Sequence, residues 1–74
     1  MVRTKEVGTN EVRRFRRSTD LTQAALAEAI GVSRQTVISI ERGDYAPSVY
    51  LALRLARALD TTVETLFSTD ETNS

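Results

Sequence analysis

The stretch from Ser33 to Gly43 contains side chains that could read the edges of DNA base pairs. If this stretch is helical, a rotation of about 100° per residue places Val37 and Ile40 on one side. The opposite side then carries Gln35, Ile38, Ser39 and Arg42. Glutamine and arginine can form paired hydrogen bonds with bases in the major groove, and isoleucine can contact a thymine methyl group. The spacing therefore predicts a recognition helix with one face for a core and one face for bases.

Capping residues mark the ends of this helix and of a helix that precedes it. Ser33 is a preferred N-cap, and Gly43 is a preferred left-handed stop. Upstream, Thr22 caps a helix that ends at Gly31, so only Val32 separates this glycine from the next cap. The apolar stripe of this preceding helix is expected at Ala25, Leu26, Ala29 and Ile30. Two helices joined by a short turn that contains glycine match the helix-turn-helix pattern.

A phosphate-binding position is expected at the start of the helix that Thr22 caps. The hydroxyl of Thr22 and the amide of Gln23 lie where backbone N–H groups and the helix dipole favour an anion. Four arginines fall within five residues of the preceding segment. Their position beside the phosphate-binding end leads us to expect backbone contacts from Arg13 and Arg17, and Arg42 is assigned to phosphate as well. An ordinary solvated basic face remains the alternative for these arginines.

The charge of the chain is unevenly distributed, although its net charge is zero. Residues 1–42 hold eight Arg or Lys and five acids, a net charge of +3, whereas residues 43–74 hold two and five, a net charge of −3. Nucleic-acid-binding domains are commonly basic, so the total charge alone argues against such a partner. The basic first half nevertheless provides a surface that fits one.

The composition excludes several classes of protein. Without cysteine or histidine, the chain has no disulfide framework, zinc finger, thiol nucleophile or imidazole base. We see no nucleophile and base set, no phosphate-binding glycine loop and no metal-ligand cluster. We therefore expect no enzyme, no cofactor, no metal and no small-molecule ligand. No apolar run approaches the ~20 residues that span a bilayer, and the first ten residues do not form a secretory signal, so a cytoplasmic protein is expected.

Two further helices are expected to flank the helix-turn-helix pair. The first runs from about 11 to 18 behind Asn10 as its N-cap. Asp20 stands where a glycine would end this helix and is expected to adopt the left-handed conformation. After Pro47, another helix runs from about 49 to 59. Its buried stripe is expected at Val49, Ala52, Leu55, Ala56 and Leu59.

A short fifth helix is expected at the end of the folded region. Asp60 replaces a second helix-ending glycine, and Thr61 with Glu64 forms a capping box, although Thr62 is a competing cap. The helix would carry Val63, Leu66 and Phe67. Large apolar groups at the end of a small chain need cover. We expect Leu66 and Phe67 both to close the core and to form a dimer interface, because marginal cores often gain from self-association.

The chain is long enough for one domain, which we place at residues 10–67. Residues 1–9 are expected to form a flexible N-terminal arm, which could follow a phosphate backbone through Arg3 and Lys5 or could be a frayed terminus. Residues 68–74 are polar and acidic and are expected to be disordered.

From Val12 to Phe67, the chain resembles the phage-repressor and Cro type, or XRE-like, helix-turn-helix regulators, particularly their short single-domain members. The matching segments are LTQAALAEAIGVSRQTVISIERGDYAPS and LALRLARALDTTVETLF. The glutamine after Thr22, the turn at Gly31, the IERG ending and the Pro-Ser step all stand at the family's spacings. The resemblance implies an all-α, five-helix lambda-repressor-like DNA-binding domain.

The resemblance also implies roles for individual residues. Gln23 corresponds to a glutamine that contacts phosphate. The base-reading positions fall on Arg34, Gln35 and Ser39, with Ile38 beside them. Arg16 and Glu41 correspond to a structural ion pair between the first and third helices.

Two functions are compatible with these features. The first is a sequence-specific DNA-binding transcriptional regulator, acting as a repressor that binds double-stranded DNA at a palindromic operator as a homodimer. The alternative is a protein-interaction module of the same fold, such as an antitoxin-like partner or a transcription adaptor. In that case the acidic second half and the face carrying Tyr50, Arg54 and Arg57 would bind a protein partner.

Overall fold

The computed structural model describes residues 10–67, which form an all-α fold. The five helices are α1 (Val12–Ser18), α2 (Gln23–Ile30), α3 (Arg34–Arg42), α4 (Val49–Ala58) and α5 (Val63–Leu66). The helix order and number agree with the sequence prediction. The predicted arm at residues 1–9 and tail at residues 68–74 lie outside the described residues. No helix within residues 10–67 has the length and hydrophobicity needed to cross a bilayer.

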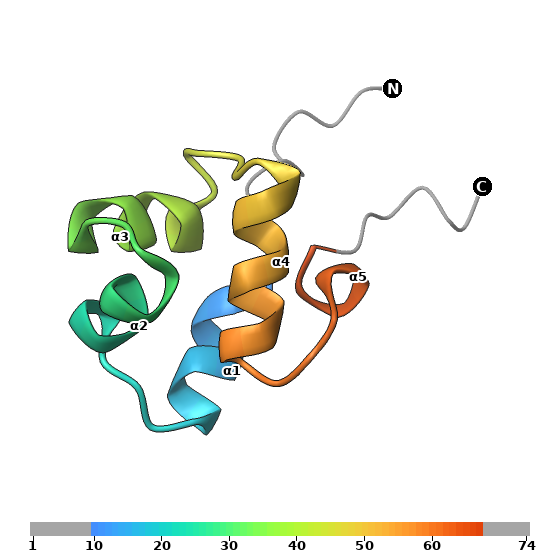
Figure 1. Cartoon of the computed structure of the whole chain (residues 1–74), viewed down its shortest axis with the longest axis horizontal. Helices are drawn as coiled ribbons and strands as arrows, with labels where there is room; N and C mark the ends of the chain where they lie inside the picture. Colours follow the sequence, from blue (N-terminus) through green and yellow to red (C-terminus); the bar gives the residue numbers. More distant parts are fainter. Residues whose placement is uncertain (1–9, 68–74) are drawn as a thin grey trace.

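The helices are arranged around α4 (Figure 1). The helices α2 and α3 pack against each other on one side of α4, and α5 lies on its other side. The helix α1 reaches behind α4 and contacts α3. The helices α3 and α5 therefore lie on different sides of the domain.

All five helices contribute to a single apolar core. Its buried members are Val12, Leu26, Ala27, Ile30, Val37, Ile40, Leu51, Leu55, Ala56, Leu59 and Leu66. The prediction that Val37 and Ile40 form the inner face of α3 is confirmed, since they are at most 1% exposed. Because the core draws on every helix, the position of α3 is fixed by the whole domain.

The predicted stripe of α2 was partly wrong. Leu26 and Ile30 are buried, but Ala27 completes the inner face, whereas Ala29 is exposed and Ala25 only half-buried. The cause is that α2 packs against both α3 and α4. A helix with alanine on every side gives no local preference between neighbouring rotations, so these two contacts determine which alanine is buried.

The prediction for α4 also failed at its first residue. Val49 is 72% exposed, whereas Leu51, which was not predicted, is buried. The inner face of α4 is centred on Leu51 and Leu55, so Val49 lies at its edge. Val49 also occupies the first turn, where no earlier turn of the helix can cover it.

The helix starts follow the predicted capping chemistry. The hydroxyls of Thr22, Ser33, Ser48 and Thr62 each accept a hydrogen bond from the backbone N–H three residues later, at 2.9, 3.1, 3.1 and 3.1 Å. Of the two candidates at α5, Thr62 is the cap rather than Thr61. Helix α1 begins at Val12, one residue later than expected, and the Val12 N–H donates to the Asn10 side chain at 3.0 Å.

The left-handed conformation predicted for Asp20 is confirmed, with φ of 63°, and Asp60 adopts it too, with φ of 57°. Gly31 and Gly43 reach the same region, with φ of 79° and 81°. These two glycines end α2 and α3 and so set the direction in which the chain leaves each helix.

Candidate nucleic-acid interface

The outer face of α3 carries five of the residues predicted to contact DNA. Arg34, Gln35 and Arg42 are exposed, and Ile38 and Ser39 are half-buried. They occupy positions one, two, five, six and nine of α3, which share one side of a helix. The side opposite is anchored in the core, so these side chains are presented on a fixed support.

A groove runs along one side of this face, between α1, α2 and α3. Its lining consists of Arg13, Arg16, Thr22, Gln23, Ala24, Arg34, Ile38, Glu41 and Arg42. The structure thus brings three predicted phosphate contacts, Arg13, Thr22 and Gln23, beside two predicted base contacts, Arg34 and Ile38. Four arginines and one glutamate line this groove, so its charge favours a phosphate backbone.

A second groove borders the other side of α3. Gln35 and Ser39 line it together with Ser33, Thr36, Asp44 and Tyr45. The helix α3 is therefore a ridge between two grooves, with Arg34 and Ile38 facing one and Gln35 and Ser39 facing the other. A protruding helix with hollows on both sides has the shape needed to enter the major groove.

Asp44 and Tyr45 were not among the predicted site residues. The Asp44 N–H donates to the Ser39 carbonyl at 2.9 Å, which folds the chain after Gly43 back along α3. Tyr45 remains 47% exposed at the groove. Gly43 was the feature of the sequence that could have indicated these two residues. A glycine in the left-handed conformation ends a helix, and the residues after it then fold back along the last helical turn.

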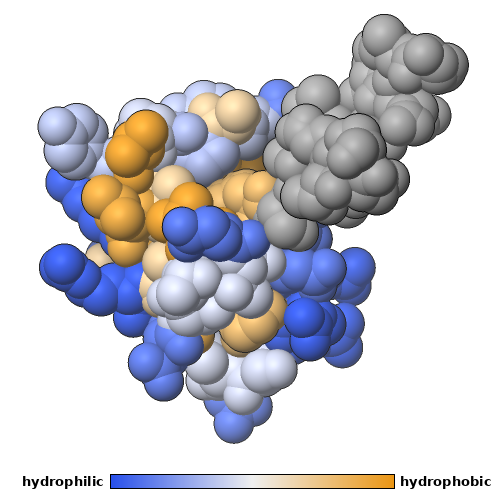
Figure 2. All heavy atoms as spheres, turned by 90° about the vertical axis from the view of Figure 1, so that its right-hand side faces the viewer, coloured by the Kyte–Doolittle hydropathy of each residue, from blue (hydrophilic) through white to orange (hydrophobic). Residues whose placement is uncertain are grey.

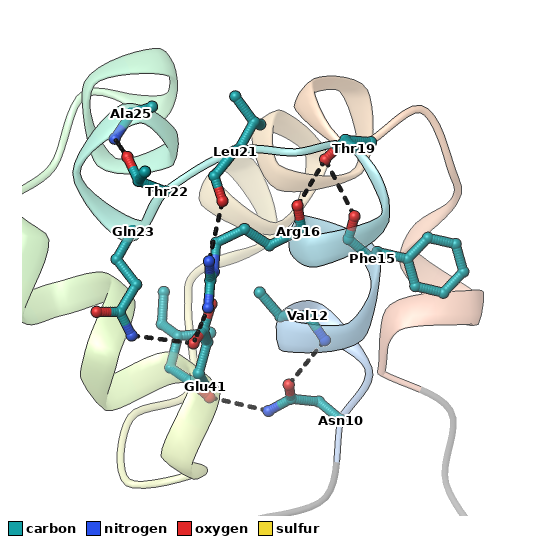
Figure 3. Close-up of polar contacts among 11 residues, drawn as sticks. Asn10, Val12, Phe15, Arg16, Thr19, Leu21, Thr22, Gln23, Ala25 and Glu41 are labelled. Atoms are coloured by element: carbon teal, nitrogen blue, oxygen red, sulfur yellow. Dashed lines mark hydrogen bonds and ion pairs between the residues drawn. The ribbon is translucent and has the colours of Figure 1, made fainter.

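Arg16 and Glu41 form an ion pair that joins α1 to α3 (Figure 3). Arg16 Nε lies 2.5 Å from Glu41 Oε2, and Arg16 Nη2 lies 3.3 Å from Glu41 Oε1. Arg16 Nη1 also donates to the Leu21 carbonyl at 2.9 Å. The two side chains are only 12% and 4% exposed, so the pair is close to buried.

Gln23 belongs to the same network. Its Nε2 donates to Glu41 Oε1 at 3.2 Å, and its amide oxygen points away from the carboxylate (Figure 3). This contact was not predicted, because it depends on α2 and α3 packing together. A side-chain amide nitrogen carries two hydrogens, so one remains to donate to a phosphate. Glu41 thereby fixes the direction in which Gln23 presents its amide to the groove.

The N-terminus of α2 adds backbone donors at this position. Thr22 caps the Ala25 N–H through its side chain and the Leu26 N–H through its carbonyl. The backbone N–H groups of Gln23 and Ala24 lie in the first turn of α2, where they have no acceptor within the helix, and they point out of its N-terminus. Together with the Gln23 side chain, they make an anion-binding position.

The basic residues of α1 are not equivalent. Arg13 lines the groove beside α3, whereas Arg17 lies in a separate hollow with Asn10, Arg13, Arg14 and Ser18. Arg14 pairs with Glu11 at 2.7 Å and lies 4.8 Å from the centre of the Phe15 ring. Arg17 is therefore placed beyond Arg13, away from the base-reading residues.

Arg42 lies at the end of α3 and pairs with Asp44, with Nε and Oδ2 3.4 Å apart. Both side chains are largely exposed, at 70% and 62%, so this pair is weak and can be exchanged for another partner.

Leu66 does not have the exposed surface that a direct dimer contact needs. It is 0% exposed within the single chain, so its predicted place in the core is confirmed, whereas its predicted part in a dimer interface is corrected. Phe67 is half-buried and keeps surface to offer. The end of α5 folds inward because the Glu11 N–H donates to the Leu66 carbonyl at 2.9 Å, which joins the two ends of the domain.

These features define a DNA-binding helix-turn-helix domain of the lambda-repressor-like fold. Within residues 10–67, no group of three or more His, Cys, Asp or Glu side chains is placed to hold a metal ion. The family described as Helix-turn-helix matches residues 12–66. The chain belongs to this XRE/Cro-like family of transcriptional regulators, which is not a family of enzymes.

Similar proteins cover most of the chain. An uncharacterized HTH-type transcriptional regulator of Methanothermobacter thermautotrophicus is 49% identical over 61 residues, covering 81% of this chain and 88% of that protein. The HTH-type transcriptional regulator YgzD of Bacillus subtilis is 42% identical over 64 residues, covering 86% of this chain and 97% of that protein. The restriction-modification controller protein C.AhdI of Aeromonas hydrophila has a similar structure, with a TM-score of 0.73 and 35% identity over 84% of this chain and 92% of that one. The predicted family and fold are thus confirmed.

Proposed function

We propose that this regulator is a repressor that binds a palindromic operator as a homodimer, with α3 of each copy in the major groove. The observation that supports this most is the α3 ridge, which carries hydrogen-bonding side chains outward and has an arginine-rich groove along one side. Repression is the simpler mode, because a protein bound over a promoter blocks polymerase without any further contact.

Base recognition is assigned to Arg34, Gln35, Ile38 and Ser39. Arginine pairs best with the O6 and N7 acceptors of guanine, and glutamine pairs best with adenine N6 and N7. Ile38 would contact a thymine methyl group and Ser39 either type of base. Arg34 and Ile38 would then contact bases on one side of α3, and Gln35 and Ser39 would contact bases on its other side.

Backbone contacts are assigned to Arg13, Arg17, Thr22, Gln23 and Arg42. Four of them line the groove on one side of α3, and Arg17 lies in the next hollow along α1, so they would fix the register of α3 in the major groove without reading the sequence. Each cation that meets a phosphate releases bound counterions, so affinity should fall steeply with salt. Arg42→Ala should reduce the slope of log affinity against log salt by about one.

A dimer would place its two α3 helices about 34 Å apart. This distance is one turn of the DNA duplex, which is the spacing at which dimeric helix-turn-helix repressors bind two half-sites. The small core of a chain of this length also favours self-association.

Selection of bound duplexes from a random library tests the function directly. Wild type should enrich a two-fold-symmetric motif, and Gln35→Ala should lose information at one position in each half-site. Gln23→Ala is the matched control, because it makes the same chemical change at a backbone contact and should weaken binding to all sequences alike. Equal loss at every base for Gln35→Ala would contradict its role. No enrichment by a folded wild type would favour a protein partner instead.

A further inference from the structure

A basic hollow lies on the exposed side of α1, next to the groove that borders α3. We call it the α1 hollow, and its lining consists of Asn10, Arg13, Arg14, Arg17 and Ser18. Its three arginines are all exposed. Glu11 pairs with Arg14, whereas Arg13 and Arg17 form no ion pair with an acid among residues 10–67. Three guanidinium groups around one hollow, with one acid paired to them, favour an anion as its occupant.

The last described residues lie beside the start of α1. The Glu11 N–H donates to the Leu66 carbonyl at 2.9 Å, so Phe67 follows α5 at a point next to the residue that precedes α1. Asn10 is the sequence neighbour of Glu11 and lines the α1 hollow. The chain after Phe67 therefore starts near one end of this hollow.

The segment after Phe67 carries the charge that complements the hollow. Residues 68–74, which we call the acidic segment, read STDETNS and contain Asp70 and Glu71 but no basic residue. An extended chain covers about 3.3–3.6 Å per residue, so the carboxylates lie within about 10–14 Å of chain from Phe67. The distance along α1 from its first residue to Arg17 is about 7.5 Å, at about 1.5 Å per residue. The acidic segment is thus long enough to bring its carboxylates to the arginines of the hollow.

The composition of the acidic segment fits the α1 hollow and not the apolar surface of the domain. The segment contains no aliphatic or aromatic residue. Figure 2 shows the side of the domain that carries α4 and α5, where apolar surface gathers. Val49 and Leu53 of α4 are 72% and 50% exposed. Polar side chains gain nothing by covering such groups, whereas carboxylates form charge-assisted hydrogen bonds with guanidinium groups.

We infer that the acidic segment docks in the α1 hollow and competes there with DNA phosphate. The carboxylates are those of Asp70 and Glu71. Their partners are Arg13 and Arg17, and the inference rests on the phosphate contacts proposed for these two arginines. Arg13 also lines the groove beside α3, so a carboxylate bound to it acts directly on the DNA-binding surface. The acidic segment lowers the affinity for DNA of any sequence and leaves base preference unchanged.

The connection at Phe67 makes this pairing intramolecular. Exposed ion pairs are individually weak, but a short connection gives an effective concentration of about millimolar. The apparent dissociation constant for DNA rises by the inverse of the fraction of molecules in which the arginines are available. If the acidic segment occupies the hollow in about half to three quarters of the molecules, DNA binding is weakened about two- to fourfold.

A spin label on the acidic segment tests the docking in the absence of DNA. The chain has no cysteine, so Thr72→Cys gives one attachment site in the full chain. At about 0.05 M salt, where exposed charges are weakly screened, the label should broaden the amide NMR signals of α1 as far as Arg17 and Ser18. Asp70→Asn with Glu71→Gln in the labelled chain should lower this broadening at least about twofold, because the ion pairs are removed. Raising the salt to about 0.3 M should have the same effect.

Titration of a random-sequence duplex by fluorescence anisotropy tests the competition. Asp70→Asn with Glu71→Gln should bind the duplex about two- to fourfold more tightly than wild type at about 0.05 M salt. At about 0.3 M salt, the two proteins should agree within about 1.5-fold, because the acidic segment is then released in wild type as well.

Asp60→Asn with Glu64→Gln is the matched control. It removes the same number of negative charges from exposed residues that line neither the α1 hollow nor the groove beside α3. Asparagine also tolerates the left-handed conformation of Asp60. Because these charges lie away from the DNA-binding surface, the control should change DNA affinity less than about 1.5-fold at either salt concentration.

The outcomes separate this inference from the proposed function. Equal tightening of DNA binding by the two double variants would overturn the competition, because the acidic segment would then act only through net charge. Unchanged broadening of Arg17 and Ser18 after Asp70→Asn with Glu71→Gln would overturn the docking. A wild type that binds no duplex, but shows the broadening and its loss, would refute the proposed function and the competition while supporting the docking.

Discussion

Replacing Glu41 with alanine would leave the guanidinium of Arg16 without its carboxylate in a nearly buried position. The change removes three hydrogen bonds to Glu41, two from Arg16 and one from Gln23. Removing one partner of a buried pair costs about 3–5 kcal/mol. Arg16 retains its bond to the Leu21 carbonyl and is 12% exposed, so we expect the lower end, about 3 kcal/mol.

Such a loss is large for this domain. Stability of about 0.05–0.15 kcal/mol per residue gives a domain of this length only about 3–9 kcal/mol. A loss of 3 kcal/mol should lower the melting temperature by about 12–24 °C, at 4–8 °C per kcal/mol. Circular dichroism during thermal and urea unfolding measures both quantities.

Two further variants separate the physical causes. Arg16→Met with Glu41→Leu removes both charges, so it should recover most of the lost stability, because no unpaired charge stays buried. Glu11→Ala breaks the exposed pair with Arg14 and should cost less than about 1 kcal/mol. If Glu41→Ala costs no more than Glu11→Ala, or if the double variant is as unstable as the single one, the assigned role of the buried pair is wrong.

Two other substitutions test the turns around the recognition helix. Asp20→Gly should raise stability by up to about 1 kcal/mol, because φ of 63° is strained for aspartate and not for glycine; an unchanged melting temperature would argue against that strain. Asp44→Asn should strengthen DNA binding about two- to fivefold at low salt and less at high salt, because it removes a negative charge beside the groove and releases Arg42 for phosphate. Titrating one operator at two salt concentrations measures this change, and equal or weaker binding at low salt would contradict it.

Local chemistry explains what could be predicted. The hydroxyl caps Thr22 and Ser33, the two helix-ending glycines and the left-handed Asp20 each depend on a few neighbouring residues. The inner face of α3 could be predicted as well. Its three aliphatic residues are Val37, Ile38 and Ile40, and of these Val37 and Ile40 are spaced to share one side of a helix.

Packing between helices explains what could not be predicted. The exposure of Ala29 and Val49, and the burial of Ala27 and Leu51, depend on how α2 and α4 rotate against their neighbours. Local spacing allowed more than one rotation, since alanine and leucine recur on several sides of these helices.

By itself, the sequence determined the five helices, their order, the side chains that α3 turns outward and the family to which the chain belongs. These features follow from the residue types and their spacing along the chain. Only the tertiary structure decided that Glu41 holds Gln23 as well as Arg16, that α3 separates two grooves, and that Leu66 is buried while Val49 and Leu53 are exposed. Each of these depends on contacts between residues far apart in the sequence, which come together only when the helices pack.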